Sequence, residues 1–298
     1  MNRIVIALIG SLALLSPGQS SSPAAVTPRS HIMFIVLENH EYEEVTSNSM
    51  PFLYAQAQKY VLLTNEYAIR HPSLPNYIGL IAGRTFYIDS NCERGDPGSG
   101  WPCNISEKSL TNSLSAKGLG WKGYMENLPA GCSNVETAPG GYVKKHNPFM
   151  FFDRIRNNGS RCTARVVPLT QLTTDLANNE LPRYSFLTPN LCHDGHDCSL
   201  ATADDFLAAW VPLILAKIGS NGVIFITFDE GDSNKGCCNG QAAGGHVFTA
   251  IIGPGAKLNT KITKALDHYS LLRAVEENWG LALLNRSAKA PTLRGWQS

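Results

Sequence analysis

The chain has 298 residues, of which 43% are hydrophobic and 16% are charged. That length suffices for one large core, and the apolar content is too high for an intrinsically disordered chain. The formal net charge is +1, from 25 basic and 24 acidic residues. The chain has no excess of basic residues, so we expect no nucleic-acid partner.

The first residues predict an export signal. Arg3 is followed by an apolar run over 4–15 and then by a small, polar stretch over 16–25. This order is typical of a secretory signal peptide, and the run is shorter than the roughly 20 residues that cross a bilayer. We therefore expect residues 1–25 to be a cleaved signal and 26–298 to be a single domain. A secreted or periplasmic protein without a stable transmembrane segment is expected.

Eight cysteines are consistent with an exported chain that carries disulfides. Their spacing includes no Cys-x-x-Cys pair, which disfavours a structural zinc site. The short loops between Cys92 and Cys103 and between Cys192 and Cys198 are rich in Gly, Asp or His. We expect each loop to be closed by a disulfide.

The apolar patterns alternate between strand-like and helix-like segments. In chain order the predicted elements are a strand over 31–37, helices over 50–60, 73–82 and 109–117, strands over 120–125 and 183–188, a helix over 202–218, strands over 222–228 and 246–252, and a helix over 267–279. A capping box from Thr202 to Asp205 is expected to begin the fourth helix. Segments 86–108 and 127–148 are rich in Gly, Pro, Asn and Cys and are expected to be loops or a cap. This alternation predicts an α/β sandwich around a mostly parallel sheet.

Polar residues directly follow the predicted strands. Glu38 and Asn39 follow the first, the 190–197 segment follows another, and Asp229 and Glu230 follow the strand over 222–228. In open α/β sheets, ligands bind beyond the carboxyl ends of the strands. These oxygen ligands suit a hard or borderline divalent cation. The alternative is that they are ordinary polar residues of surface loops.

Ser73 follows a proline-fixed turn and opens a predicted helix. A helix N-terminus favours an anion such as phosphate, and a serine beside a metal ion can become a nucleophile. The alternative is that Ser73 is only a helix cap. Among the histidines, His146, His196 and His246 lie in polar or glycine-rich settings. A lone histidine is more often structural than catalytic, and His268 is expected to cap or pack at its helix start.

Several short stretches resemble, in the same order, the bacterial and fungal phosphoesterase family that contains secreted acid phosphatases and phospholipases C. They are 36–39, 71–77, 142–148, 189–190 with 194–197, 227–232, 245–246 and 268–272. The resemblance implies an alkaline-phosphatase-like three-layer α/β/α sandwich with loop-rich, disulfide-stapled insertions, and one phosphoesterase catalytic domain over 26–298. The stretch over 145–149 and the modest length are closest to the acid phosphatase branch.

The resemblance also implies a role for each matching residue. Ser73 matches the nucleophile, and His196 or His146 the group that protonates the leaving oxygen. Metal-binding positions are matched by Glu38, Asn39, Asp229 and Glu230. Positions at or beside the bound phosphate are matched by Asn76, His246 and Asp194. The implied cofactor is one or more divalent ions, which could be Mg, Ca, Mn or Zn.

The expected function is that of a secreted acid phosphatase that hydrolyses phosphomonoesters through a metal-activated serine and a phosphoserine intermediate. The alternative is a phospholipase C, which would use the same residues on a phospholipid phosphodiester. A non-catalytic secreted protein that binds a phosphorylated ligand is a third interpretation, since a fold alone does not guarantee chemistry. The expected partner is a small phosphorylated substrate or a phospholipid head group.

Overall fold

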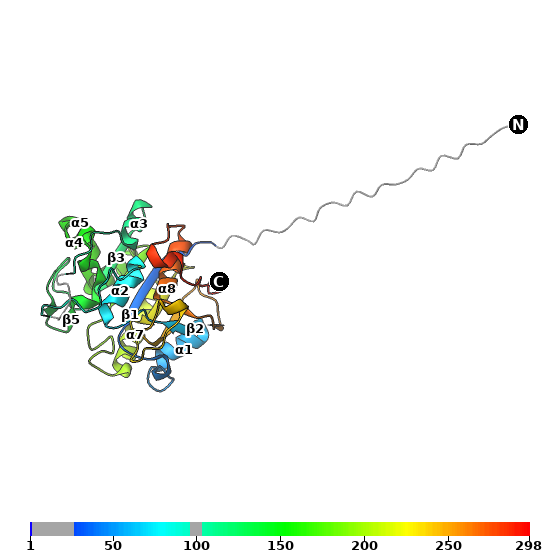
Figure 1. The fold of residues 1–298 in the computed structure, drawn as a ribbon, viewed down its shortest axis with the longest axis horizontal. Helices are drawn as coiled ribbons and strands as arrows, with labels where there is room; N and C mark the ends of the chain where they lie inside the picture. Colours follow the sequence, from blue (N-terminus) through cyan, green and yellow to red (C-terminus); the bar gives the residue numbers. More distant parts are fainter. Residues whose placement is uncertain (2–26, 96–102) are drawn as a thin grey trace.

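The computed structural model describes Met1 and residues 27–95 and 103–298 (Figure 1). The predicted signal segment lies outside the described residues, apart from Met1. No helix in the described ranges has both the length and the apolar character needed to span a membrane.

The centre of the molecule is one mixed sheet with strand order β10-β2-β9-β8-β1-β7-β3-β6. Strand β1 pairs in parallel with both β7 and β8, and every residue of these three strands is buried. Strand β9 runs antiparallel to β8 and β2. The bounds are β1 Ile32–Leu37, β2 Val61–Tyr67, β3 Trp121–Met125, β6 Val166–Pro168, β7 Tyr184–Thr188, β8 Val223–Phe228, β9 His246–Ile252, β10 Thr260–Ile262 and β11 Leu266–Asp267. The prediction of an α/β fold with a mostly parallel sheet is confirmed.

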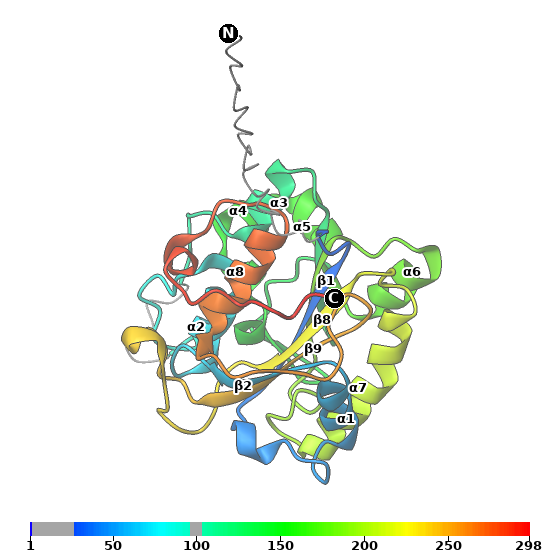
Figure 2. The same cartoon turned by 90° about the vertical axis from the view of Figure 1, so that its right-hand side faces the viewer.

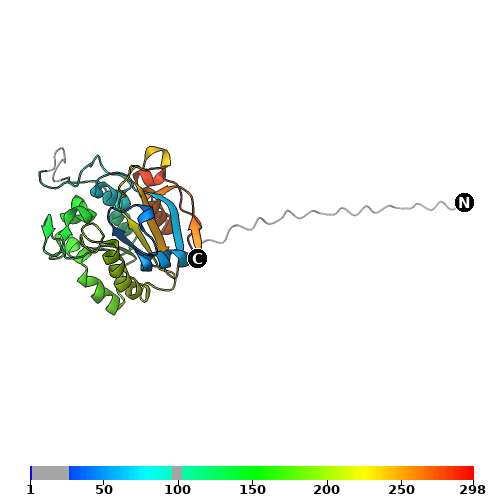
Figure 3. The ribbon, with the colours of Figure 1, turned by 90° about the horizontal axis from the view of Figure 1, so that it is seen from below.

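Helices cover both faces of this sheet, because alternate residues of each buried strand point to opposite sides. Ile32, Phe34 and Val36 of β1 pack with residues of α2, α3 and α8, whereas Met33 and Ile35 pack with residues of α1, α6 and α7. Figure 2 shows α2 and α8 on one side of the sheet and α1 and α7 on the other, and Figure 3 shows the strands between the helices. The bounds are α1 Pro51–Lys59, α2 Ser73–Ala82, α3 Leu110–Ala116, α4 Asp153–Arg156, α5 Gly159–Arg165, α6 Thr170–Asn178, α7 Leu200–Leu215 and α8 His268–Asn278.

The predicted start of α7 was wrong by a few residues. The helix begins at Leu200, and its N-cap is Ser199, whose hydroxyl accepts the Thr202 N–H. Thr202 is therefore inside the first turn, because the serine three residues earlier already caps the helix. The segment over 127–148 contains two short strands, β4 (Thr137–Ala138) and β5 (Tyr142–Val143), which pair with each other.

Disulfides fix several of the connecting loops. Cys92–Cys103 and Cys192–Cys198 are paired as predicted. Two further bonds join Cys132 to Cys162 and Cys237 to its neighbour Cys238. The Cys192–Cys198 bond closes the loop that follows β7 and carries Asp194 and His196.

Candidate active site

The ends of β1 and β8 bring two buried carboxylates together. Leu37 and Phe228 are paired across the two strands, so Glu38 and Asp229 leave the sheet side by side. Both are fully buried. The next residue, Asn39, has φ 52°, a left-handed conformation that asparagine tolerates. Its backbone N–H turns back and donates to Asp229 Oδ1 at 3.1 Å.

The Ser73 hydroxyl lies between carboxylates from these two strands. Ser73 Oγ donates at 3.1 Å to Glu38 Oε2 and is also 3.1 Å from Glu230 Oε1. Ser73 is the first residue of α2, while the N-cap position is occupied by Pro72. The capping alternative therefore does not account for this serine, whose hydroxyl contacts acids from two other segments.

The carboxylates of the cluster disfavour one another's ionisation. Burial, followed by the charge of Asp229, raises the pKa of Glu38 well above its ordinary value. Burial, followed by the charge of Glu230, does the same to the pKa of Asp229. Burial also raises the pKa of Glu230 to about 7. Buried carboxylates of this kind require a proton or a cation beside them.

Within the described residues, two oxygens of the segments that follow β1 and β8 have no hydrogen-bond partner although they are buried. They are Asp229 Oδ2 and Asn39 Oδ1. Together with the Glu38 and Glu230 carboxylates they form an all-oxygen donor set, which is the preference of hard divalent cations. The chemistry of these donors thus suits a divalent cation.

Two residues that the sequence argument did not assign also hold this cluster. His71 Nδ1 lies 2.6 Å from Glu230 Oε2, and its Nε2 donates to the Ser233 carbonyl at 3.0 Å. The Tyr77 hydroxyl donates to Glu38 Oε1. Burial and the Glu38 charge raise the pKa of Tyr77 well above its ordinary value, so it remains a donor. Tyr77 is four residues after Ser73, a spacing that places both on one helix face.

His146 lies between two buried carboxyl groups. Its Nε2 is 3.2 Å from Glu38 Oε1, its Nδ1 is 3.2 Å from Asp194 Oδ2, and its ring stacks on Tyr77 with centroids 5.2 Å apart. Burial, followed by the Lys145 charge, lowers the pKa of His146 well below its ordinary value. Burial raises the pKa of Asp194 to about 7. A neutral imidazole has one N–H, so one of the facing carboxyl groups must carry a proton or contact a cation.

His196 lies at the open edge of the same cluster. Its side chain is 28% exposed, and its Nδ1 is 2.6 Å from Asp197 Oδ1. Its Nε2 is 3.4 Å from Lys145 Nζ, and its ring centroid is 6.0 Å from that of His146. The His196 backbone N–H donates to Asp194 Oδ1 at 2.8 Å, which ties its position to the buried part of the cluster.

The structure gives Asn76 a different environment from that expected of a phosphate contact. Its Oδ1 accepts the N–H groups of Ile69 and Arg70 at 2.9 and 3.1 Å, and its Nδ2 donates to the carbonyls of Arg70 and Pro72 at 2.6 and 3.3 Å. The amide is thus occupied by the turn that precedes Ser73. Asn76 fixes that turn.

His246 is placed among aromatic rings at the start of β9. Its ring stacks on Tyr42 and Tyr67, with centroids 4.6 and 5.2 Å apart. Its Nε2 lies 3.1 Å from the Thr64 carbonyl, and its Nδ1 lies 3.7 Å from Glu43. These partners are separate from those of Ser73.

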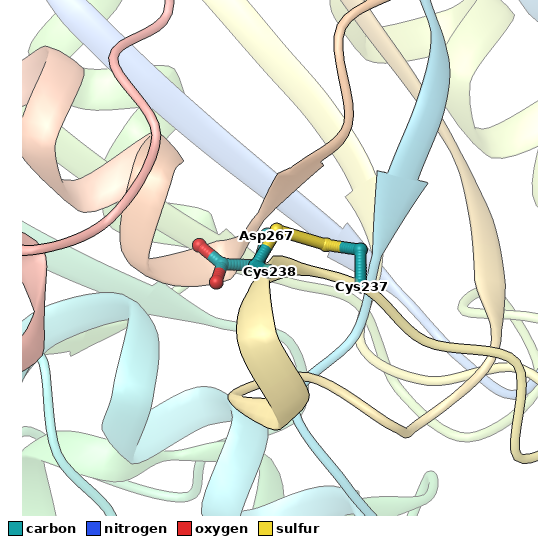
Figure 4. A group of neighbouring side chains, drawn as sticks. All are labelled: Cys237, Cys238 and Asp267. Atoms are coloured by element: carbon teal, nitrogen blue, oxygen red, sulfur yellow. A yellow bond between two sulfur atoms is a disulfide. The ribbon is translucent and has the colours of Figure 1, made fainter.

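Among the described residues, two groups of His, Cys, Asp or Glu side chains have donor atoms within 4.8 Å of one another, close enough to share a metal ion, and the carboxylates of Glu38, Asp229 and Glu230 are not such a group. Glu38, His146 and Asp194 form one group, and Cys237, Cys238 and Asp267 the other. Figure 4 shows that the two cysteines of the second group are joined in a disulfide. Because a metal-binding cysteine must be a thiolate, this second group is not a metal site. Asp267 is also the N-cap of α8 and accepts the Ser270 N–H at 2.9 Å.

The fold of the chain is alkaline-phosphatase-like. A solved structure of an alkaline phosphatase superfamily protein from Vibrio parahaemolyticus superposes with a TM-score of 0.61 at 12% identity, covering 91% of this chain and 72% of that one. The predicted three-layer architecture is confirmed. The chain belongs to the Phosphoesterase family, whose sequence pattern matches residues 36–282. The resemblance stated from the short motifs is thereby confirmed.

Curated relatives carry phosphatase names. A probable acid phosphatase of Kluyveromyces lactis is 34% identical over 268 residues, which are 85% of this chain and 58% of the fungal protein. A phosphatidylinositol-3-phosphatase of Mycobacterium tuberculosis is 26% identical over 97% of this chain and 90% of its own length. The chain thus spans little more than half the length of the fungal relative and nearly all of the bacterial one.

Proposed function

We propose that this chain is a metal-dependent phosphoric ester hydrolase with Ser73 as its nucleophile. The observation that carries the proposal is the position of Ser73 Oγ, 3.1 Å from both Glu38 and Glu230 at the start of a buried helix. The segments of these two acids also carry two buried oxygens without a hydrogen-bond partner among the described residues, Asn39 Oδ1 and Asp229 Oδ2. Family membership and the phosphatase names of the relatives support the same chemistry.

Glu38, Asn39, Asp229 and Glu230 would hold the cation. When bound, it supplies a Lewis acid that polarises a phosphoryl oxygen and lowers the pKa of a nearby hydroxyl. The protein groups around it have separate tasks. Tyr77 fixes one Glu38 oxygen, and His71 fixes one Glu230 oxygen, so that both carboxylates keep their orientation toward Ser73.

The reaction proceeds in two displacements. Ser73 Oγ attacks phosphorus as its proton leaves toward Glu38 Oε2 or Glu230 Oε1, each 3.1 Å away. The bond from phosphorus to the leaving oxygen breaks, and that oxygen takes a proton from the enzyme. The positive end of α2 favours the phosphoryl group during this step. Water then attacks phosphorus and gives a proton to the group that protonated the leaving oxygen. The bond from phosphorus to Ser73 Oγ breaks, Ser73 Oγ takes back the proton held by the carboxylate, and inorganic phosphate leaves.

We assign the proton for the leaving oxygen to His196 rather than to His146. Both nitrogens of His146 face carboxyl groups at 3.2 Å, so neither is directed at a substrate. His196 is partly exposed, and the Asp197 carboxylate at 2.6 Å orients its ring. A histidine that reaches solvent can be reprotonated between turnovers, as a general acid requires.

The proposed substrates are phosphomonoesters, as in the acid phosphatase branch. The bacterial relative is named a phosphatidylinositol-3-phosphatase, so the phosphorylated head group of a lipid is also a candidate substrate. A secreted or periplasmic location is supported by the four disulfides of the described residues and by the predicted signal over 1–25. Residues 26–298 are proposed as the single catalytic domain.

The deciding experiment is hydrolysis of p-nitrophenyl phosphate from pH 4 to 9 by the purified chain, with and without a chelator. We expect chelator-sensitive activity that Ser73→Ala lowers by about a thousandfold or more while the far-UV spectrum is unchanged. The matched control is Ser106→Ala, at an exposed serine. Near-normal turnover by Ser73→Ala would remove Ser73 as nucleophile.

The same assay with a phosphatidylcholine emulsion separates a monoesterase from a phospholipase C. Release of diacylglycerol without p-nitrophenyl phosphate hydrolysis would favour the phospholipase. Binding of phosphate without turnover on either substrate, with every divalent metal supplied, would favour the non-catalytic interpretation.

A further inference from the structure

A cationic pocket lies beside the C-terminal end of α2, and one of its lining residues, Arg70, precedes Ser73 by three positions. It has a volume of about 430 Å³, and its lining includes Arg70, Arg84, Arg286 and Lys289 but no acidic residue. Arg84 follows the end of α2, whereas Arg286 and Lys289 come from the C-terminal segment that packs over α2 and α8 (Figure 2).

None of these four cations has an anionic partner within the described ranges. Ion pairs elsewhere in those ranges engage Lys122, Arg156, Lys235 and Arg273, but none includes a pocket cation. Four positive charges in one concave site repel one another unless an anion is bound. The pocket therefore has the charge of an anion-binding site.

Helix capping does not account for the cations. Basic residues near a helix C-terminus commonly satisfy its last carbonyl groups. Here the Asn285 amide donates to the Ala82 carbonyl at 2.8 Å, and the Arg286 backbone N–H donates to the Gly83 carbonyl at 2.9 Å. The charged ends of the pocket cations therefore do not serve as the helix cap, and that of Arg286 lies over the Tyr269 ring, 5.9 Å from its centroid.

The rim of the pocket is aromatic as well as basic. The Arg84 guanidinium lies over the rings of Phe86 and Tyr87, at 5.4 and 5.0 Å from their centroids. Tyr87 is 86% exposed, which is unusual for so large a ring. Exposed aromatic rings beside Lys and Arg are the composition of protein surfaces that contact lipid head groups.

We propose that this pocket binds the phosphate of an anionic phospholipid and holds the enzyme at a bilayer surface. The inference rests on the proposed function and extends it to substrates that are presented by a membrane. Arg84 follows the ten residues of α2 and is therefore about 15 Å from Ser73 along the helix axis. A second phosphate on the sugar ring of a substrate bound at Ser73 does not reach Arg84 across that separation. A membrane surface that presents many head groups can supply one phosphate to the pocket while another head group lies at Ser73.

The test is binding of the full chain to phosphatidylcholine vesicles with and without phosphatidylserine, measured by co-sedimentation. The pocket variant is Arg84→Gln, Arg286→Gln and Lys289→Gln together. The matched control is Lys217→Gln, Lys257→Gln and Lys261→Gln, which removes the same charge at other exposed positions. Thermal unfolding of each variant verifies that it is folded. We expect the pocket variant to bind anionic vesicles about tenfold or more weakly and the control variant to bind as the parent does.

Three results would overturn the proposal. The first is equal loss of binding in both variants, which would mean that only net charge matters. The second is the absence of binding to any vesicle. The third is pocket-dependent binding of inorganic phosphate that displaces the chain from vesicles, which would make this a site for soluble anions. Because binding is measured without turnover, failure of hydrolysis would count against the proposed function and leave the lipid result standing.

Discussion

Ser73 shows how one side chain gains its chemistry from its contacts. A serine at the start of a helix ordinarily bonds its own first turn. Here Pro72 holds the capping position, and the Ser73 hydroxyl is directed to Glu38 and Glu230 instead. The neighbours of these acids, Tyr77 and His71, occupy the carboxylate oxygens that face away from the serine.

The different surroundings of His196 and His146 lead to a prediction about leaving groups. We expect His196→Asn to lower kcat for an alkyl phosphate by about a hundredfold or more, because an alkoxide leaves poorly without a proton. Turnover of p-nitrophenyl phosphate should change much less, since nitrophenolate leaves unprotonated. Steady-state kinetics on both substrates would measure this difference.

His146→Asn is the matched comparison. It alters the contacts of Glu38 and Asp194 and should impair both substrates alike. If His146→Asn rather than His196→Asn showed the selective loss on alkyl phosphates, the two assignments would have to be exchanged.

Some of the site residues could be predicted because they adjoin easily recognised strands. Glu38 and Asp229 directly follow continuous apolar runs, and the parallel pairing of those runs brings them together. His71 and Tyr77 were missed although they lie in a stretch that was singled out. Their roles depend on contacts with Glu230 and Glu38, which are far away in the sequence, and a single sequence does not contain those contacts.

At the scale of elements, α8 and the short helix η5 (Asn285–Ala288) are joined through one buried acid. Glu276 Oε1 accepts the Leu284 N–H at 2.9 Å, and its Oε2 accepts the Ser287 hydroxyl at 2.6 Å. Burial raises the pKa of Glu276 to about 7 from an ordinary value of 4.5. The native state therefore keeps this proton at pH values where the unfolded chain has lost it.

This shift predicts a pH-dependent stability. Because the folded pKa is raised, stability is greatest below pH 4.5 and falls as the pH rises toward about 7, by about 3 kcal/mol from this group. We expect Glu276→Gln to remove that part of the slope. Urea denaturation at a series of pH values would measure it, with Glu277→Gln on the same helix as the control. An unchanged slope in Glu276→Gln would show that Glu276 ionises normally.

The elements that could be predicted are those with one clear pattern. Strands β1 and β8 are unbroken apolar runs, and α8 has both helical spacing and an acidic cap. Strand β2 was missed because it begins two residues after α1 ends, with no glycine or proline between them, and because Thr64 and Asn65 interrupt its apolar run. Its place in the sheet comes from pairing with β9, which is distant in sequence.

At the scale of the whole molecule, a bound cation should raise the stability of the fold. A divalent ion at a hundred times its dissociation constant adds about 2.7 kcal/mol to the free energy of unfolding. We expect a chelator to lower the melting temperature and Asp229→Asn to abolish that response, as measured by calorimetry. A chelator effect that persists in Asp229→Asn would place the ion elsewhere.

The response should also depend on pH, with a defined sign. Without a cation, the raised pKa of Glu230, at about 7, makes the fold less stable as the pH rises from 4.5 toward that value. A cation displaces the proton and therefore binds more tightly as the pH rises. The melting temperatures with and without metal should consequently diverge between pH 5 and 8.

The Cys192–Cys198 bond has a consequence for where the enzyme can work. It closes the loop over 192–198, which carries Asp194 and the proposed acid His196, so the geometry of proton delivery depends on a covalent bond that only an oxidising compartment maintains. In a reducing cytosol the chain would still contain Ser73 and the carboxylates that follow β1 and β8. The loop that carries His196 would not be closed by a disulfide. On the proposed export, this loop would be closed only after the chain had left the cytosol.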